Sequence, residues 1–140
     1  MTLRLLPLAA ATLFLSACAS NDTHQTVSVE DITGQKWQLV SVDGESITPL
    51  GNKIPQLQLD TSLKANGVAG CNNFFGQAQW QDGQLKIENM GMTMMMCPEG
   101  LDQIEQKVSA TLSQWSTASL EGNQLTLTGN EHTLIYQYED

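Results

Sequence analysis

Alternating apolar and polar residues run through most of the chain after residue 35 and predict short β-strands. Leu57 and Leu59 alternate with glutamines, and Leu125 and Leu127 alternate with threonines. Asp-Gly pairs at 43–44 and 82–83 are typical of two-residue hairpin turns. The expected strands cover residues 37–42, 45–48, 54–60, 63–71, 77–81, 84–89, 119–121, 124–128 and 132–138.

In one segment the spacing of apolar residues changes from two to between three and four, and this spacing predicts an amphipathic helix. Its apolar stripe consists of Leu101, Ile104, Val108, Leu112 and Trp115. Pro98 suits the first helical position, and Glu105, Gln106 and Lys107 are expected on the solvent face. The fold class is therefore mainly β with one α-helix. We expect a small, partly closed antiparallel β-barrel of about eight short strands, with the helix inserted before the last three.

The first 17 residues lack this pattern and have the features of a signal peptide. A single charge, Arg4, precedes an apolar run over 5–15 that is too short to span a membrane. The sequence Leu15-Ser16-Ala17-Cys18 resembles the bacterial lipobox, which implies cleavage before Cys18 and lipid attachment to it. An ordinary signal peptide followed by an unrelated cysteine is the alternative.

The rest of the chain divides into a tether and a domain. Residues 18–33 are polar and predict a lipidated, flexible tether with one helical turn near its end, and residues 34–140 form the domain. Ala19 after the cysteine implies an outer-membrane lipoprotein that faces the periplasm. The acyl chains would then attach the protein to the membrane.

Composition and charge exclude one class of partner. The 140-residue chain has a net charge of −9, and its only arginine, Arg4, lies in the predicted signal peptide. Such a chain cannot neutralise phosphates, which excludes nucleic acid as a partner. A basic protein, a cation or a neutral ligand remains a candidate.

Two cysteines remain in the mature chain, Cys71 and Cys97, which lie 26 positions apart. In an oxidising compartment such a pair predicts a disulfide. The alternatives are two buried thiols or half of a metal site. Zinc is disfavoured because the chain has no Cys-x-x-Cys pair, and only His24 and His132 could add ligands.

Two motifs carry a resemblance to a known family. Gly70-Cys71-Asn72-Asn73-Phe74-Phe75-Gly76, followed by Met92-Thr93-Met94-Met95-Met96-Cys97-Pro98, resembles the paired signature of the META domain family, and in particular its bacterial heat-shock lipoproteins. The resemblance implies a barrel with one helix, an envelope location and a link to heat or antibiotic stress. It implies no enzyme, because the family has no established catalytic activity.

The residues themselves also predict no catalysis. His132, beside Glu131, is the only histidine of the domain, and no serine lies in a Gly-x-Ser-x-Gly elbow. No glycine-rich phosphate loop is present, and no cofactor is expected.

The methionines are the most unusual feature. Five of the six lie within residues 90–96, and thioethers can select Cu(I). We expect packing instead, with Met92, Met94 and Met96 on one side of an extended segment and one of its sides against Leu101 and Ile104. This interpretation predicts no metal site.

The remaining site candidates concern a ligand of unknown type. Phe74 is expected in the core, whereas the residues that could line a ligand site are Trp37, Phe75, Met94 and Met96. The leading interpretation is a non-enzymatic, lipid-anchored envelope protein that acts by binding in a stress response. One alternative is an inhibitor or interaction module for a basic protein such as lysozyme. The other is a carrier of a lipid or another hydrophobic ligand.

Overall fold

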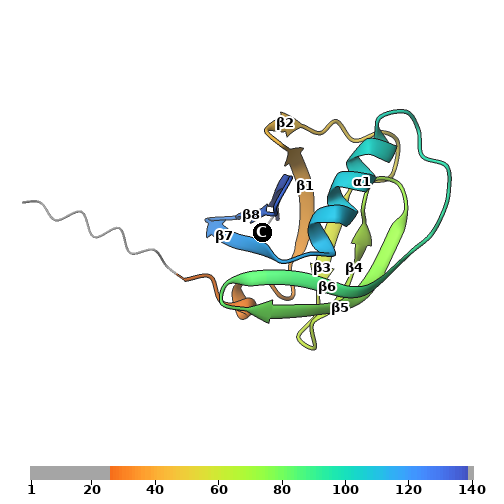
Figure 1. The fold of residues 1–140 in the computed structure, drawn as a ribbon. Helices are drawn as coiled ribbons and strands as arrows, with labels where there is room; N and C mark the ends of the chain where they lie inside the picture. The colour runs from red at the N-terminus through yellow and green to blue at the C-terminus, as the bar shows by residue number, and fades with distance from the viewer. Residues whose placement is uncertain (1–25, 139–140) are drawn as a thin grey trace, which may run out of the picture.

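A computed structural model describes residues 26–138, which form one antiparallel sheet with a single α-helix (Figure 1). The elements in chain order are the 3-10 turn η1 (Val29–Asp31), β1 (Lys36–Val42), β2 (Glu45–Ser46), β3 (Gln56–Leu59), β4 (Lys64–Val68), β5 (Asn73–Gln81), β6 (Gln84–Met92), α1 (Leu101–Leu112), β7 (Ser116–Glu121), β8 (Gln124–Thr128) and β9 (Thr133–Gln137).

The sheet closes on itself to form a barrel. Each strand from β3 to β8 pairs with the next along the chain, β1 pairs with β3, and β1 also pairs with β9. Eight strands thus form the barrel, and β2 adds a short hairpin strand to β1. The predicted fold class is confirmed, and closure goes further than expected because β9 returns to β1 over the registers Gln38↔Gln137 to Val42↔Leu134.

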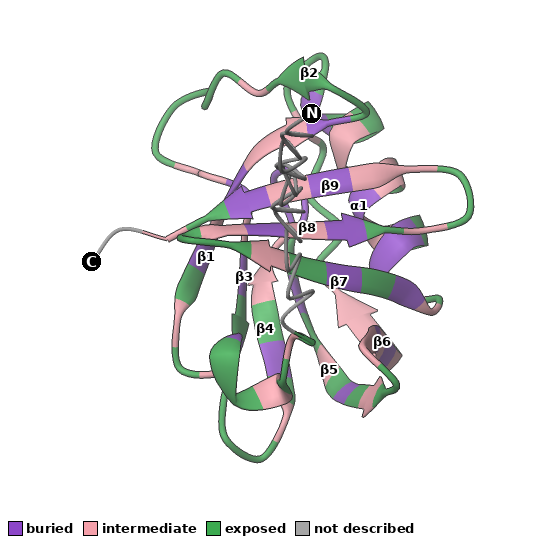
Figure 2. Ribbon diagram, turned by 90° about the vertical axis from the view of Figure 1, so that its left-hand side faces the viewer, coloured by how far each residue is buried: buried purple, intermediate pink, exposed green. Residues whose placement is uncertain are grey.

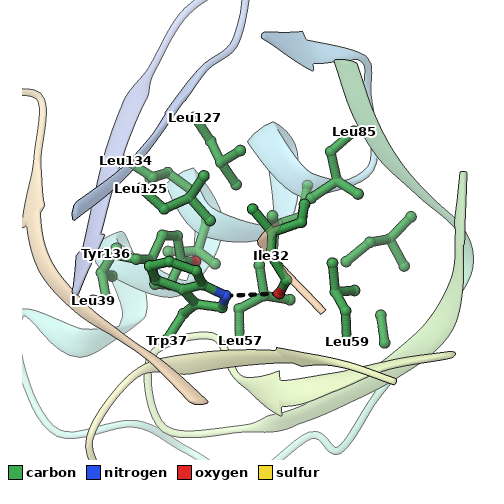
Figure 3. Packing of buried hydrophobic residues seen from close by; sticks show 14 of the residues in the cluster. Ile32, Trp37, Leu39, Leu57, Leu59, Leu85, Leu125, Leu127, Leu134 and Tyr136 are labelled. Carbon is green, nitrogen blue, oxygen red and sulfur yellow. Dashed lines mark hydrogen bonds between the residues drawn. The ribbon is translucent and has the colours of Figure 1, made fainter. Parts of the chain in front are cut away.

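Alternation along the strands fills the barrel interior with side chains. Figure 2 shows buried and more exposed positions alternating along β8 and β9. Trp37, Tyr136 and Phe74 are the largest buried side chains, each at most 1% exposed. The Trp37 indole N–H donates to the carbonyl of Ile32 at 2.9 Å (Figure 3). Trp37 therefore belongs to the core, and its prediction as a ligand-lining residue is wrong, because leucines and Ile32 surround it.

The N-terminal boundary of the domain differs from the prediction. Ile32 is fully buried in the core, and Val27 packs partly against it. The amide of Gly34 donates to the carbonyl of Leu59 at 2.8 Å. Residues 27–33 thus belong to the domain instead of the tether, because an apolar side chain in this polar stretch closes the core.

The helix α1 presents four of the five residues of the predicted apolar stripe to the barrel, and the fifth, Trp115, lies beyond the end of the helix at Leu112. Leu101, Val108 and Leu112 are buried, and Ile104 packs partly against the core. The helix begins three residues later than predicted, because Gly100 has a φ of +92° and turns the chain between Pro98 and the first helical residue. Because of this turn, the loop before the helix does not continue along the helix axis.

The two longest strands, β5 and β6, exceed their predicted lengths at the ends far from their Asp-Gly turn. The alternation of apolar and polar residues does not predict this extension, because the extension contains glycines and a register shift between Phe75 and Gln77. Phe75 pairs with Gly91, and a Cβ at Gly91 would lie 2.5 Å from the Phe75 ring. Gly91 thus leaves room for the aromatic ring on the outside of the barrel.

Candidate functional site

The two sequence motifs meet at one end of the barrel. Residues 69–72 turn the chain between β4 and β5, and residues 93–100, which we call the methionine loop, connect β6 to α1. Cys71 and Cys97 form a disulfide with a Cα–Cα distance of 5.5 Å. The bond joins the turn to the methionine loop just before the helix.

Asn72 holds the methionine loop through both ends of its side-chain amide. Its Oδ1 accepts from the backbone N–H of Met95 at 2.6 Å and from the Thr93 hydroxyl at 3.0 Å. Its Nδ2 donates to the carbonyl of Met95 at 2.9 Å and to a carboxylate oxygen of Glu105 at 2.7 Å. Asn72 is only 3% exposed, so these bonds compensate for the burial of a polar group.

Glu105 completes this cluster from α1. Its second carboxylate oxygen accepts from the backbone N–H groups of Cys71 at 3.0 Å and of Asn72 at 2.8 Å. Burial alone would raise the pKa of the Glu105 carboxyl. Hydrogen bonds from the Asn72 side chain and from the backbone amides of Asn72, Cys71 and Gly70 outweigh it and lower the pKa below its ordinary 4.5.

The prediction that Glu105 faces solvent is wrong. Helical spacing places it beside the apolar stripe, and the turn at residues 69–72 covers it with N–H donors. Gly70 permits this approach, because a Cβ there would clash with the carbonyl of Leu101 and lie 2.8 Å from the Glu105 Cβ. The glycine of the motif was the sequence signal for a close approach. It did not reveal which helical residue approaches.

The methionines of the loop do not pack under the helix. Met94 and Met96 are 95% and 98% exposed, and Met95 is 52% exposed. Only Met90 and Met92, in β6, pack partly against the core. The predicted packing of Met94 and Met96 against Leu101 and Ile104 is therefore wrong. Hydrogen bonds and the disulfide fix the loop backbone in a place where these two side chains point outward.

The other residues predicted for a site do not lie together in the structure. Phe74 is buried in the core, as predicted, whereas Phe75 is 60% exposed on the outer face of β5. Cys18 and the predicted signal peptide lie outside the described residues. The structure thus leaves Phe75, Met94 and Met96 at the surface and removes Trp37 from any candidate site.

His132 lies in a separate polar cluster. Its Nδ1 is 2.9 Å from a carboxylate oxygen of Asp43, which also lies 3.2 Å from the Lys107 ammonium. The other Asp43 oxygen accepts from the backbone N–H of Thr133 at 2.9 Å. These contacts tie the β1–β2 turn to β9 and α1. Within residues 26–138, no hydroxyl or thiol is hydrogen-bonded to His132.

One group among the described residues has the spacing of metal ligands. Donor atoms of Cys71, Cys97 and Glu105 lie within 4.8 Å of one another. The two sulfurs are bonded to each other, and the carboxylate already accepts three N–H groups. This group is therefore a structural cluster, and it does not have the free donors of a metal site.

The fold and this cluster define a small closed barrel domain whose two motif segments are joined by a disulfide and a buried amide. The META domain model matches residues 30–140, and the chain belongs to the META domain family, which confirms the resemblance seen in the sequence. A relative, the heat shock protein HslJ of Escherichia coli (strain K12), is 30% identical over 132 residues, which cover 94% of this chain and 92% of HslJ. The chain thus belongs to a heat-shock-type, stress-related family.

Two solved NMR structures share the fold. One is 28% identical with a TM-score of 0.71 and covers 80% of this chain and 95% of its own. The other, from Burkholderia xenovorans, has a TM-score of 0.66 at 21% identity over 98% of this chain and 99% of its own.

No helix among residues 26–138 has the length and apolar character needed to cross a membrane.

Glu105→Gln tests the polar cluster. A carboxylate has two acceptor oxygens, whereas the amide of glutamine has one oxygen and one NH2 donor. The NH2 group would face either the backbone N–H groups of Cys71 and Asn72 or the Asn72 NH2 group, so the variant should lose about 2 kcal/mol of unfolding free energy at pH 7. Because the folded pKa of Glu105 is lowered, its ionised form adds stability above pH 4.5 that is lost as the pH falls through the folded pKa. Urea unfolding of both proteins between pH 7 and pH 3 should show the gap closing at low pH.

Glu121→Gln, at an exposed position, is the control and should leave stability within about 0.5 kcal/mol of the wild type. The wild type and the variants should all lose some stability at low pH through Asp43. Contacts with the Thr133 amide, His132 and Lys107 outweigh the effect of burial and lower the pKa of the Asp43 carboxyl. A gap between Glu105→Gln and wild type that stays constant down to pH 3 would contradict the role given to the carboxylate.

The disulfide has its own test. Closing a loop between positions 26 apart should stabilise the domain by about 3.5 kcal/mol on chain-entropy grounds. Alkylation of the unfolded, unreduced protein should leave Cys71 and Cys97 unlabelled. Reduction should lower the unfolding midpoint while the circular dichroism spectrum of the folded state stays the same. Labelling of both cysteines before reduction would refute the bond.

Proposed function

We propose that this chain is a lipid-anchored envelope protein that acts in stress tolerance by binding a partner through its methionine loop, without catalysis. The single observation that carries the proposal is the exposure of Met94 and Met96 on a backbone that a disulfide and Asn72 hold in place. Exposed apolar side chains on a fixed loop are typical of interaction surfaces. Methionines in particular adapt to varied partner shapes.

The position of the loop supports this role. In Figure 1 the described chain enters at η1 on the left, and the methionine loop lies on the opposite side of the barrel. Seven residues lie between Cys18 and Thr26, and the eight steps from one to the other span at most about 28 Å when extended. A lipid on Cys18 would hold the η1 side near the membrane. The methionine loop would then face the periplasm.

Charge identifies the class of partner. Exposed Glu99 and Asp102 border the exposed methionines, and residues 18–140 hold five lysines against 15 acidic residues. A protein that carries an apolar patch among basic residues would complement this surface. An inhibitor of a basic protein such as lysozyme is a specific form of this proposal, and the charge is its support.

The other functions considered from the sequence receive less support. The described part of the barrel is filled by core side chains such as Trp37, Phe74 and Tyr136, which offers no support for a carrier of hydrophobic ligands. His132 is engaged with Asp43 in a contact that ties elements together, which is consistent with a protein that is not an enzyme. Binding at the surface is therefore the function that we favour.

The anchor is tested by Cys18→Ser. Because the lipobox places the acyl chains on the sulfur of this residue, the variant should incorporate no radiolabelled palmitate and should leave the membrane fraction. Cys18→Ser is expected to fold normally, since the domain starts near residue 27. Palmitate incorporation at the wild-type level would refute the proposed anchor.

The methionine loop is tested in a strain that lacks this protein. The double variant Met94→Ser/Met96→Ser removes the apolar tips and should fail to restore survival of heat or antibiotic stress. Met94→Leu/Met96→Leu is the matched control, because it keeps the apolar surface and should restore survival. The two variants should match the wild type in thermal unfolding, since both side chains are exposed.

Equal rescue by the serine and the leucine variant would refute binding through the methionine loop. A separate assay with purified lysozyme addresses the specific alternative. Inhibition that weakens as salt rises would support it. Inhibition by the serine variant equal to that by the wild type would place the contact elsewhere on the domain.

A further inference from the structure

The methionine loop presents thioether sulfurs to solvent in a short stretch of chain. Met94 and Met96 are almost fully exposed, and Met95 between them is half exposed. The expectation that this segment binds no metal depended on packing, which the structure does not show. Thioethers are soft ligands and select soft ions such as Cu(I) over Mg²⁺, Ca²⁺ or Mn²⁺. We propose that the methionine loop binds one soft monovalent metal ion, Cu(I), with Ag(I) as its redox-inert equivalent.

Hydrogen bonds fix the backbone from which the methionine side chains extend. The Thr93 amide donates to the carbonyl of Asn73 at 3.0 Å, which continues the pairing of β6 with β5 beyond Met92. The Asn72 side chain then bonds both the N–H and the carbonyl of Met95, as a neighbouring strand would. Residues 93 and 95 are therefore held along the same edge.

Alternation follows from this pairing. In an extended segment, side chains at every second residue leave on the same side, with Cα atoms about 6.6 Å apart. Met94 and Met96 thus share a side, and Met92 precedes them at the same interval. The unbranched methionine side chain can bend toward a shared point from such positions. The loop supplies the almost fully exposed side chains of Met94 and Met96, whereas Met92, in β6, packs partly against the core.

The surroundings favour a cation and limit competing donors. Glu99 and Asp102, both exposed, lie at the end of the loop and add negative charge. Cys71 and Cys97 are joined in a disulfide, so neither sulfur is a thiolate that could take the ion. The thioethers are therefore the soft donors that the loop offers.

This inference goes beyond the proposed function and does not need it. Binding of a protein partner requires apolar tips, which leucine also provides. Binding of Cu(I) requires sulfur, which leucine lacks. Met94→Leu/Met96→Leu thus removes the sulfur and keeps the apolar surface, so it should lose the metal.

The experiment uses the full-length protein as purified, with the disulfide between Cys71 and Cys97 intact. We expect it to take one Cu(I) equivalent from a chromogenic Cu(I) chelator under anaerobic conditions, and one Ag(I) by native mass spectrometry. Met94→Leu/Met96→Leu should weaken Cu(I) binding at least tenfold. Met90→Leu is the matched control, since Met90 lies in β6 outside the loop, and it should bind Cu(I) like the wild type.

Three results would overturn the proposal. The wild-type protein could fail to compete with the chelator, the loop variant could bind as tightly as the wild type, or binding could require prior reduction of the disulfide. The last result would place the ion on Cys71 and Cys97. Thermal unfolding of all three proteins in the absence of metal should agree, which excludes misfolding as the cause of lost binding.

Discussion

The contacts of one buried amide, Asn72, hold together the end of the barrel where the two sequence motifs meet. Its side-chain oxygen accepts a hydrogen bond from the methionine loop, and its side-chain nitrogen donates to the loop and to the Glu105 carboxylate on α1. Each of these polar groups would be costly to bury alone. The turn, the loop and the helix must therefore reach their positions together, and loss of one partner leaves the others unsatisfied.

The barrel supplies what this cluster needs. Residues 72, 95 and 105 are distant in the chain, and closure of β1 on β9 fixes the strands that carry or flank them. The strands β6 and β7 pair only at Gln84–Thr117 and Leu85–Ser116, and the polypeptide between them forms the methionine loop and α1. The missing cross-strand pairs therefore give the helix room to approach Gly70. The disulfide adds a covalent tie where the loop meets the helix.

Much of the fold could be predicted because it depends on local patterns. The Asp-Gly turns have positive φ at Asp43 and Gly44, as two-residue hairpins require, and the stripe of α1 faces the core. The site could not be predicted to the same extent, because its contacts join distant segments. Ile32 in a polar stretch, Glu105 beside an apolar stripe and exposed methionines all contradict their local patterns. Tertiary contacts decide each of these positions.

The exposure of Met94 and Met96 follows from which parts of the methionine loop are held by contacts and which are not. Thr93, Met95 and Cys97 are held by the backbone and disulfide contacts of the loop, which leaves the side chains of Met94 and Met96 between fixed points. A bound partner or ion would then order side chains only, since the backbone is already ordered, and this lowers the entropic cost of binding. Met94 and Met96 also bury almost nothing in the domain itself. Selection for stability alone therefore does not explain an apolar residue at either position, whereas the proposed binding would explain it.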